Sequence, residues 1–270
     1  MSVLNKMTKH FDLMGTQNSE ASTPDALMWM RSTARPIMFR TGIEDAPISI
    51  WGTCFLAGYR RRLFAITAAH IIGNASVSQV VICAAEGSNS ALTLVKGYRL
   101  EQPPDDDYEV DVHVYETTLQ GIPQRDRDLG RIINLDRPEV TDWMGRMFTS
   151  LFFVCGHPVE LNGVNYETKL VETSQVLLAG HYHEAGSAPA QHVLKVANPL
   201  NLEEFRGMSG SPVFSLEARL ASEPLLRFCG IALMGGAERG IVRFLAATAI
   251  LQTLDSVIQE TAPGGAHISD

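Results

Sequence analysis

The chain has few of the features that membrane or secreted proteins need. No run of about 18 apolar residues is uninterrupted, so no membrane span is expected. Cysteine is scarce as well: Cys54, Cys83, Cys155 and Cys229 occur at spacings that form no disulfide framework. The first residues lack the apolar core of a secretory signal. We therefore expect reduced, buried thiols in a cytoplasmic protein.

Positive charge and metal ligands are also in short supply. Twenty-two Lys and Arg face 30 Asp and Glu, a formal net charge of −8, which argues against nucleic acid as a partner. His181 and His183 form one isolated pair, and Cys155 and His157 form another. Zinc needs three or four convergent ligands, so we expect no metal and no other cofactor.

Helical signals occur near both ends of a chain of ordinary globular composition, 45% hydrophobic over 270 residues. Thr23 suits an N-cap and Pro24 suits the first helical position, which predicts a helix over 24–35 that stops before Pro36. Apolar residues at helical spacing from Ala246 onward predict a C-terminal helix.

Between the helices, short apolar runs alternate with turn residues. They are rich in Val, Ile, Leu and Phe and typical of strands, which favours β-barrels or sandwiches over alternating βαβ units. The expected strands are 36–41, 48–57, 62–68, 78–84, 91–99, 108–117, 149–155, 168–179, 192–197, 212–216, 226–234 and 240–245.

Two distant strings carry chemistry. Thr67–His70 (TAAH) ends a buried apolar run on a histidine, and Gly207–Pro212 (GMSGSP) sets Ser209 between glycines. A serine hydroxyl is a weak nucleophile until a positioned base takes its proton. Glycines let the backbone turn sharply and point bare N–H groups at an oxygen that gains charge. Together the strings indicate an acyl-transfer site.

With these strings in this order, the chain resembles the trypsin-like, chymotrypsin-fold serine peptidases, and more narrowly their bacterial intracellular members. The resemblance covers about residues 35–260. It rests on the strings Trp51–Leu56, Phe64–His70, Asp111–Val114, Val154–Pro158, Gly207–Pro212 and Gly230–Gly235.

The resemblance implies an all-β protein of two packed six-stranded antiparallel β-barrels, with a site in the cleft between them. We place an N-terminal arm and helix at 1–35 and a first barrel carrying His70 and Asp111 at 36–120. A connecting segment follows at 121–148. A second barrel with Ser209 and the C-terminal helix spans 149–262, and a tail spans 263–270.

The expected roles follow the Ser-His-Asp relay. Ser209 is the nucleophile and His70 the general base, and the backbone N–H groups of Gly207 and Ser209 form the oxyanion hole. Asp111 is the expected partner of the imidazole, with Asp128 as the alternative. His113 is expected to be structural rather than catalytic.

Substrate selection is less well marked. Counting along the family pattern places Glu203 near the base of a substrate pocket and Gly235 and Gly240 near its walls. A buried Glu203 would favour Lys or Arg substrates; a solvated Glu203, or one paired with Arg206, would not.

Three positions depart from secreted members of the family. Met208 replaces the Asp that pairs with a freshly cut N-terminus, so we expect no N-terminal processing, with a partner or loop ordering as the remaining routes to control. Ile71 replaces a disulfide cysteine, in agreement with a reducing compartment. Ser211 stands where glycine is usual.

The expected function is therefore a serine endopeptidase acting on protein or peptide substrates, with no membrane partner. The main alternative is a non-catalytic or latent binding module on the same scaffold. An α/β-hydrolase is disfavoured, because its nucleophile turn needs glycine at 211 and its later triad members would have to be Asp255 and His267.

Overall fold

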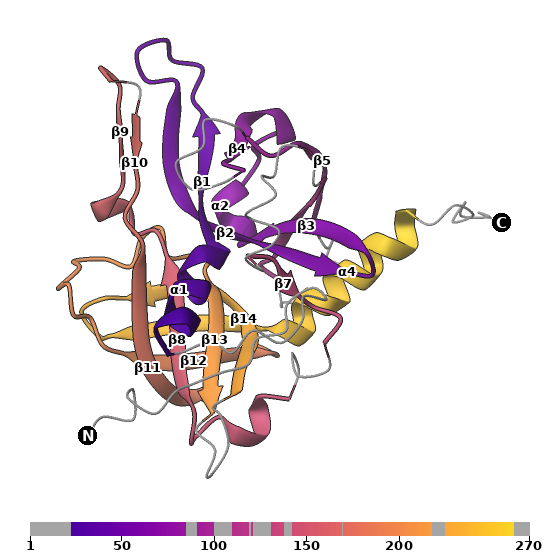
Figure 1. Ribbon diagram of the computed structural model, residues 1–270, viewed down its shortest axis with the longest axis vertical. Helices are drawn as coiled ribbons and strands as arrows, with labels where there is room; N and C mark the ends of the chain where they lie inside the picture. The colour runs from indigo at the N-terminus through magenta and orange to yellow at the C-terminus, as the bar shows by residue number, and fades with distance from the viewer. Residues whose placement is uncertain are drawn as a thin grey trace.

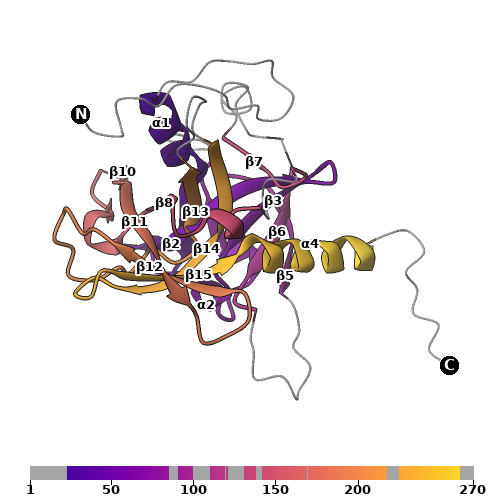
Figure 2. The ribbon, with the colours of Figure 1, turned by 90° about the horizontal axis from the view of Figure 1, so that it is seen from below.

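The computed structural model describes residues 23–84, 91–99, 110–118, 120, 131–137, 142–168, 170–217 and 225–261. Two β-barrels lie against each other, and the helices cover their junction and one side (Figures 1 and 2). The predicted all-β class with two antiparallel barrels is confirmed. Of the helices in these ranges, none has both the length and the apolar character needed to cross a bilayer.

The first barrel is built from six antiparallel strands in the order β4-β1-β2-β3-β6-β5. Its ends approach each other where the Leu92 N–H donates to the Ile82 carbonyl at 2.8 Å, beside a bridge between Cys83 and Ala91. The strands are β1 (Ala34–Arg40), β2 (Ile48–Tyr59), β3 (Arg62–Thr67), β4 (Val80–Ile82), β5 (Leu94–Arg99) and β6 (His113–Thr117), with the short β7 (Ile133–Asn134) parallel to β2.

The second barrel is closed, because its first strand, β8, pairs with both β11 and β13. Trp143, Phe152 and Phe244 fill its interior. The strands are β8 (Leu151–Gly156), β11 (Val176–Ala185), β12 (Gln191–Val196), β13 (Pro212–Glu217), β14 (Leu225–Gly236) and β15 (Ile241–Ala246).

The outer face of the second barrel continues into the core of the first. Phe228 on β14 packs on Phe55 of β2 with ring centroids 5.3 Å apart, and both side chains are buried. Helix α1 (Thr23–Thr33) lies over this junction, where Trp29 meets Phe214 edge-on at 5.3 Å. The barrels therefore share one apolar cluster, which fixes their relative position.

Helix α4 (Ala247–Thr261) extends the second barrel onto the first. It follows β15 directly and contacts β14. Its Asp255 carboxylate accepts a hydrogen bond from Tyr59 and pairs with Arg60, both at 2.8 Å. The remaining elements are α2 (Ala69–Ile72), the 3-10 turns η2 (Val77–Gln79), η4 (Met144–Arg146) and η5 (Val159–Leu161), and the hairpin of β9 (Gly163–Asn165) and β10 (Leu170–Glu172).

Several predicted boundaries are wrong for identifiable reasons. The predicted strand 168–179 is two strands, because the Asn162 side chain exchanges hydrogen bonds with the backbone of Ser174 and interrupts the ladder. The predicted helix 24–35 ends at Thr33, because Ala34 and Arg35 already pair with β2. The predicted strand 108–117 begins at His113 within the described residues, because Val110–Val112 form a tight turn.

Candidate active site

His70 lies on α2, directly after β3. Ala68 and Ala69 before it are fully buried, whereas 45% of the His70 side chain is exposed. Thr67 ends β3 and donates its hydroxyl to the Thr53 carbonyl at 2.7 Å, which ties the start of this turn to β2. The buried TAA string therefore anchors the backbone and presents the imidazole at the surface.

The Asp111 carboxylate forms two hydrogen bonds with His70. Its Oδ1 accepts the His70 backbone N–H at 2.8 Å, and its Oδ2 lies 2.5 Å from the His70 Nδ1. An ionised carboxylate only accepts hydrogen bonds, so Nδ1 carries the proton and Nε2 of the neutral ring is left as the basic atom.

The electrostatics of Asp111 agree with this role. Only 18% of its side chain is exposed, and burial alone would raise its pKa. The hydrogen bonds from His70 and the favourable charge interactions with His70 and Arg99 outweigh burial, so the pKa of Asp111 lies below its ordinary value. The carboxylate therefore stays charged near neutral pH. Asp128, the alternative, lies outside the described residues.

Ser209 lies in a turn that only glycines can frame. Gly207 and Gly210 have φ values of +89° and +84°. A Cβ at Gly210 would come within 1.8 Å of the Thr53 carbonyl oxygen and 2.5 Å of the Thr67 hydroxyl. The Ser209 turn therefore packs directly on Thr53 and Thr67, the second of which lies three residues before His70.

Two backbone amides of this turn are free. The N–H groups of Met208, Gly210 and Ser211 donate to carbonyls 2.8–3.1 Å away. Those of Gly207 and Ser209 donate to no acceptor among the residues that the structure describes. This alternation leaves the two predicted oxyanion donors available to an incoming oxygen.

Thr53 fastens the Ser209 turn to the first barrel, a role that the sequence did not reveal. Its backbone N–H donates to the Ser209 carbonyl at 3.0 Å. Its hydroxyl donates to the Gly207 carbonyl at 2.8 Å and accepts the His157 N–H at 2.9 Å. A buried threonine within the Trp51–Leu56 string was the available signal, but its residue type alone is typical of any strand.

The Ser209 hydroxyl itself points to a third group. Its Oγ donates to the Leu233 carbonyl at 2.5 Å. No hydrogen bond joins Ser209 to His70 within the described residues. The structure thus brings the turn of Ser209 against the threonines beside the His70–Asp111 pair, with the hydroxyl rotated toward β14.

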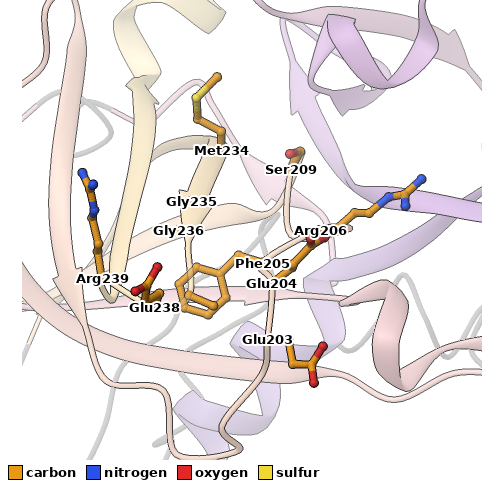
Figure 3. A pocket seen from close by; sticks show the side chains of 11 residues that line it. Glu203, Glu204, Phe205, Arg206, Ser209, Met234, Gly235, Gly236, Glu238 and Arg239 are labelled. Carbon is orange, nitrogen blue, oxygen red and sulfur yellow. The ribbon is translucent and has the colours of Figure 1, made fainter.

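A pocket of about 420 Å³ opens beside Ser209 (Figure 3). The buried Phe205 ring lies against Gly235, where a Cβ would come within 2.7 Å of it. Glu203 lines the pocket but is exposed, and its carboxylate points away from Ser209. Gly235 lines the pocket as well, whereas Gly240 lies in the β14–β15 turn and is not among the lining residues.

The loop carrying Glu203 is held by another carboxylate. Glu160 accepts the backbone N–H groups of Glu203 and Glu204 at 3.2 and 2.6 Å. Glu203 forms no ion pair with Arg206 among the described residues. The side chain of Glu203 is therefore solvated, one of the three arrangements considered from the sequence.

Three of the four cysteines are fully buried and offer no competing nucleophile. All four are free, and burial raises the pKa values of Cys54, Cys155 and Cys229 to about 12. A thiol with so high a pKa stays protonated and unreactive.

Comparison with known proteins supports the fold. No family model matches the chain, and no curated protein matches it. Among solved structures, it is similar to a thermostable serine protease, AL20, from an extremophilic microorganism. The TM-score is 0.50 at 11% sequence identity, over 85% of this chain and 98% of that one. The likeness is one of fold, and it spans both barrels.

Proposed function

We propose that the chain is a trypsin-like serine endopeptidase in which Ser209, His70 and Asp111 act in sequence on a peptide bond. The observation that carries the proposal is the pair of hydrogen bonds between Asp111 and His70. It lies beside a serine turn in which the Gly207 and Ser209 N–H groups have no acceptor among the described residues. Together these supply a nucleophile, an oriented base and an anion site, which define acyl transfer.

In the first step the Ser209 hydroxyl rotates from the Leu233 carbonyl toward Nε2 of His70. Rotation about the Cα–Cβ bond of Ser209 changes the acceptor toward which its hydroxyl points. His70 takes the proton as Oγ attacks the substrate carbonyl, and the negative charge of Asp111 stabilises the resulting imidazolium.

The oxygen of the tetrahedral intermediate accepts the N–H groups of Gly207 and Ser209. One such donor contributes about 3 kcal/mol of transition-state stabilisation. His70 then gives its proton to the leaving amine, and an acyl-enzyme ester on Ser209 remains. Water, deprotonated by His70, attacks this ester and restores the free serine.

Activity without N-terminal processing is part of the proposal. Met208 is buried in the core of the second barrel, and its thioether has no charge to pair with an N-terminal amine. Four free cysteines support a reducing, cytoplasmic location. The bacterial intracellular type rests on the sequence resemblance.

The second candidate is a latent enzyme or a non-catalytic binding module. The bond from Ser209 to Leu233 favours it, because in this arrangement the hydroxyl is not activated. In a latent enzyme, substrate or a partner would turn the hydroxyl toward His70; in a pure binding module, His70 would never deprotonate Ser209.

A fluorophosphonate probe separates the candidates, because it phosphonylates serines that an adjacent base activates. We expect the intact chain to be labelled at Ser209, with labelling lost in Ser209→Ala and His70→Ala. Ser211→Ala is the matched control, since its hydroxyl lies in the same turn, is buried and has no hydrogen-bond partner in the described part of the chain. Labelling that survives His70→Ala, or that requires prior cleavage of the chain, would contradict the proposal.

A further inference from the structure

A second pocket adjoins the one beside Ser209. It measures about 470 Å³ and shares Met234, Gly235, Gly236 and Arg239 with the first pocket. Its other lining residues are Glu184, Val193, Ile241 and Arg243. A substrate reaching Ser209 therefore has a continuous recess along β14 in which to place further side chains.

One wall of this recess is a row of residues across four strands of the second barrel. In register, Glu184 on β11 faces Val193 on β12, Val193 faces Arg243 on β15, and Arg243 faces Met234 on β14. Facing residues lie on one side of a sheet. Arg243 Nη1 lies 3.5 Å from the Met234 sulfur, which places the guanidinium beside the residue that both pockets share.

The cations of this wall are not neutralised. Neither Arg239 nor Arg243 has a carboxylate within 4.0 Å among the described residues. Lys195, which faces Ile241, adds a third cation and donates to the Arg239 carbonyl. Such a group of unpaired cations stands out in a chain of net charge −8.

Two nearby carboxylates, those of Glu184 and Glu238, do not pair with these cations within the described residues. Val193 separates Glu184 from Arg243 in the row, and the Glu184 carboxylate lies 4.0 Å from the His183 imidazole. Glu238 lines the pocket beside Ser209 rather than this one, and Figure 3 shows it next to Arg239, farther from Met234. The end of the recess nearest Met234 and Arg243 therefore carries net positive charge.

An extended peptide can reach these cations along an open strand edge. β15 pairs with one side of β14 as far as Gly236, whereas the β13 ladder on the other side stops at Ile231. Beyond the Leu233 carbonyl, which accepts the Ser209 hydroxyl, the β14 edge from Met234 to Gly236 has no ladder partner on this side among the described residues and is available for an added strand. Side chains of such a strand alternate, so every second one faces Met234 and the guanidinium groups.

We propose that this recess selects peptide substrates carrying an acidic side chain a few residues from the cleaved bond, bound by Arg239 and Arg243. The inference rests on the proposed peptidase function for its link to cleavage. Guanidinium groups bind carboxylates through paired, charge-assisted hydrogen bonds, which explains two unpaired arginines at a recess wall.

The test is a binding measurement that does not depend on catalysis. The full chain with Ser209→Ala is titrated against a fluorescein-labelled peptide of alternating Glu and Ala, and against the same peptide with Gln for Glu, with fluorescence anisotropy as the readout. At low salt we expect the Glu peptide to bind at least tenfold more tightly, and this ratio to shrink as salt screens the charges.

Variants assign the preference to the recess. In Arg239→Gln/Arg243→Gln the Glu-to-Gln ratio should fall to about one, and in Arg243→Lys it should be only partly reduced. Arg40→Gln is the matched control, because Arg40 is an exposed first-barrel arginine that also lacks a carboxylate partner among the described residues. Equal binding of the two peptides, or a ratio that the double variant leaves unchanged, would overturn the inference.

Fluorophosphonate labelling of the intact chain is run alongside. Labelling of Ser209 without an acidic preference would reject the recess and keep the peptidase. An acidic preference that disappears in the arginine variants, without labelling, would keep the recess as a peptide-binding site and reject the peptidase.

Discussion

At the scale of single residues, the orientation of His70 depends on Asp111. Asn at this position keeps the size but places an amide where a charged acceptor was, so the ring is held in the wrong tautomer. We expect Asp111→Asn to lower kcat by about 10⁴-fold with little change in KM, measured on a peptide substrate found by cleavage profiling.

Asp136→Asn is the control for this substitution. Asp136 is an exposed first-barrel carboxylate that accepts the Arg60 backbone N–H at 3.0 Å. Its loss should leave kcat unchanged. If Asp111→Asn also left kcat unchanged, another carboxylate, with Asp128 as the first to test, would be the partner of His70.

The sequence pointed to polar residues that interrupt or border apolar or glycine-rich strings. His70 ends a buried run, Asp111 precedes a strand, and Ser209 stands between glycines, so each was noticed; their joint role is still a proposal. Thr53 was missed because its role comes from partners more than 100 residues away, Gly207 and His157. No local pattern encodes a contact of that kind.

At the scale of elements, β2 holds the serine turn through the Thr53 hydroxyl. Thr53→Val keeps the shape but leaves the buried Gly207 carbonyl and His157 N–H without partners. We expect the free energy of unfolding to fall by about 2 kcal/mol. Because the turn also loses its anchor, kcat should fall at least tenfold.

Thr53→Ser retains the hydroxyl and should recover most of both quantities. Chemical denaturation gives the free energy of unfolding, and steady-state kinetics give kcat and KM. A valine variant with normal kcat would show that the turn holds its shape without this residue.

Sequence patterns located the β-strands better than their ends. Apolar runs marked the strands of both barrels because burial selects Val, Ile, Leu and Phe. The division of 168–179 depends on a side-chain bridge from Asn162 to Ser174, and the turn before β6 depends on backbone bonding of Val110 to Val112. The pattern of apolar residues along the sequence predicts neither a side-chain bridge of this kind nor the conformation of a turn.

At the scale of the whole molecule, one buried and one partly buried histidine link stability to pH. Burial lowers the pKa of His113 to about 4, with Arg99 adding to the effect, and burial lowers the pKa of His157 to about 4. In the unfolded chain each has an ordinary pKa near 6.5. Below pH 6.5 the unfolded chain therefore binds protons that the folded chain refuses.

This stability is fully present above pH 6.5, falls as the pH drops, and is completely lost only below about pH 4. The full loss is about 3 kcal/mol per histidine. Urea denaturation at pH 7.5 and 4.5 should show it. His113→Phe should reduce the difference between the two pH values, whereas His183→Gln, at an exposed position, should not. An unchanged difference in His113→Phe would mean that His113 is protonated in the folded state.

The free state of the four cysteines and their unequal burial determine how the protein can be handled and labelled. Since none of the four is oxidised, the molecule reaches its final form without an oxidant, and strong reductants can accompany every assay. Three of them are sealed inside the barrels, whereas Cys83 is only partly covered. A maleimide dye should therefore attach at Cys83 alone, and slowly, because burial raises the pKa of this thiol as well.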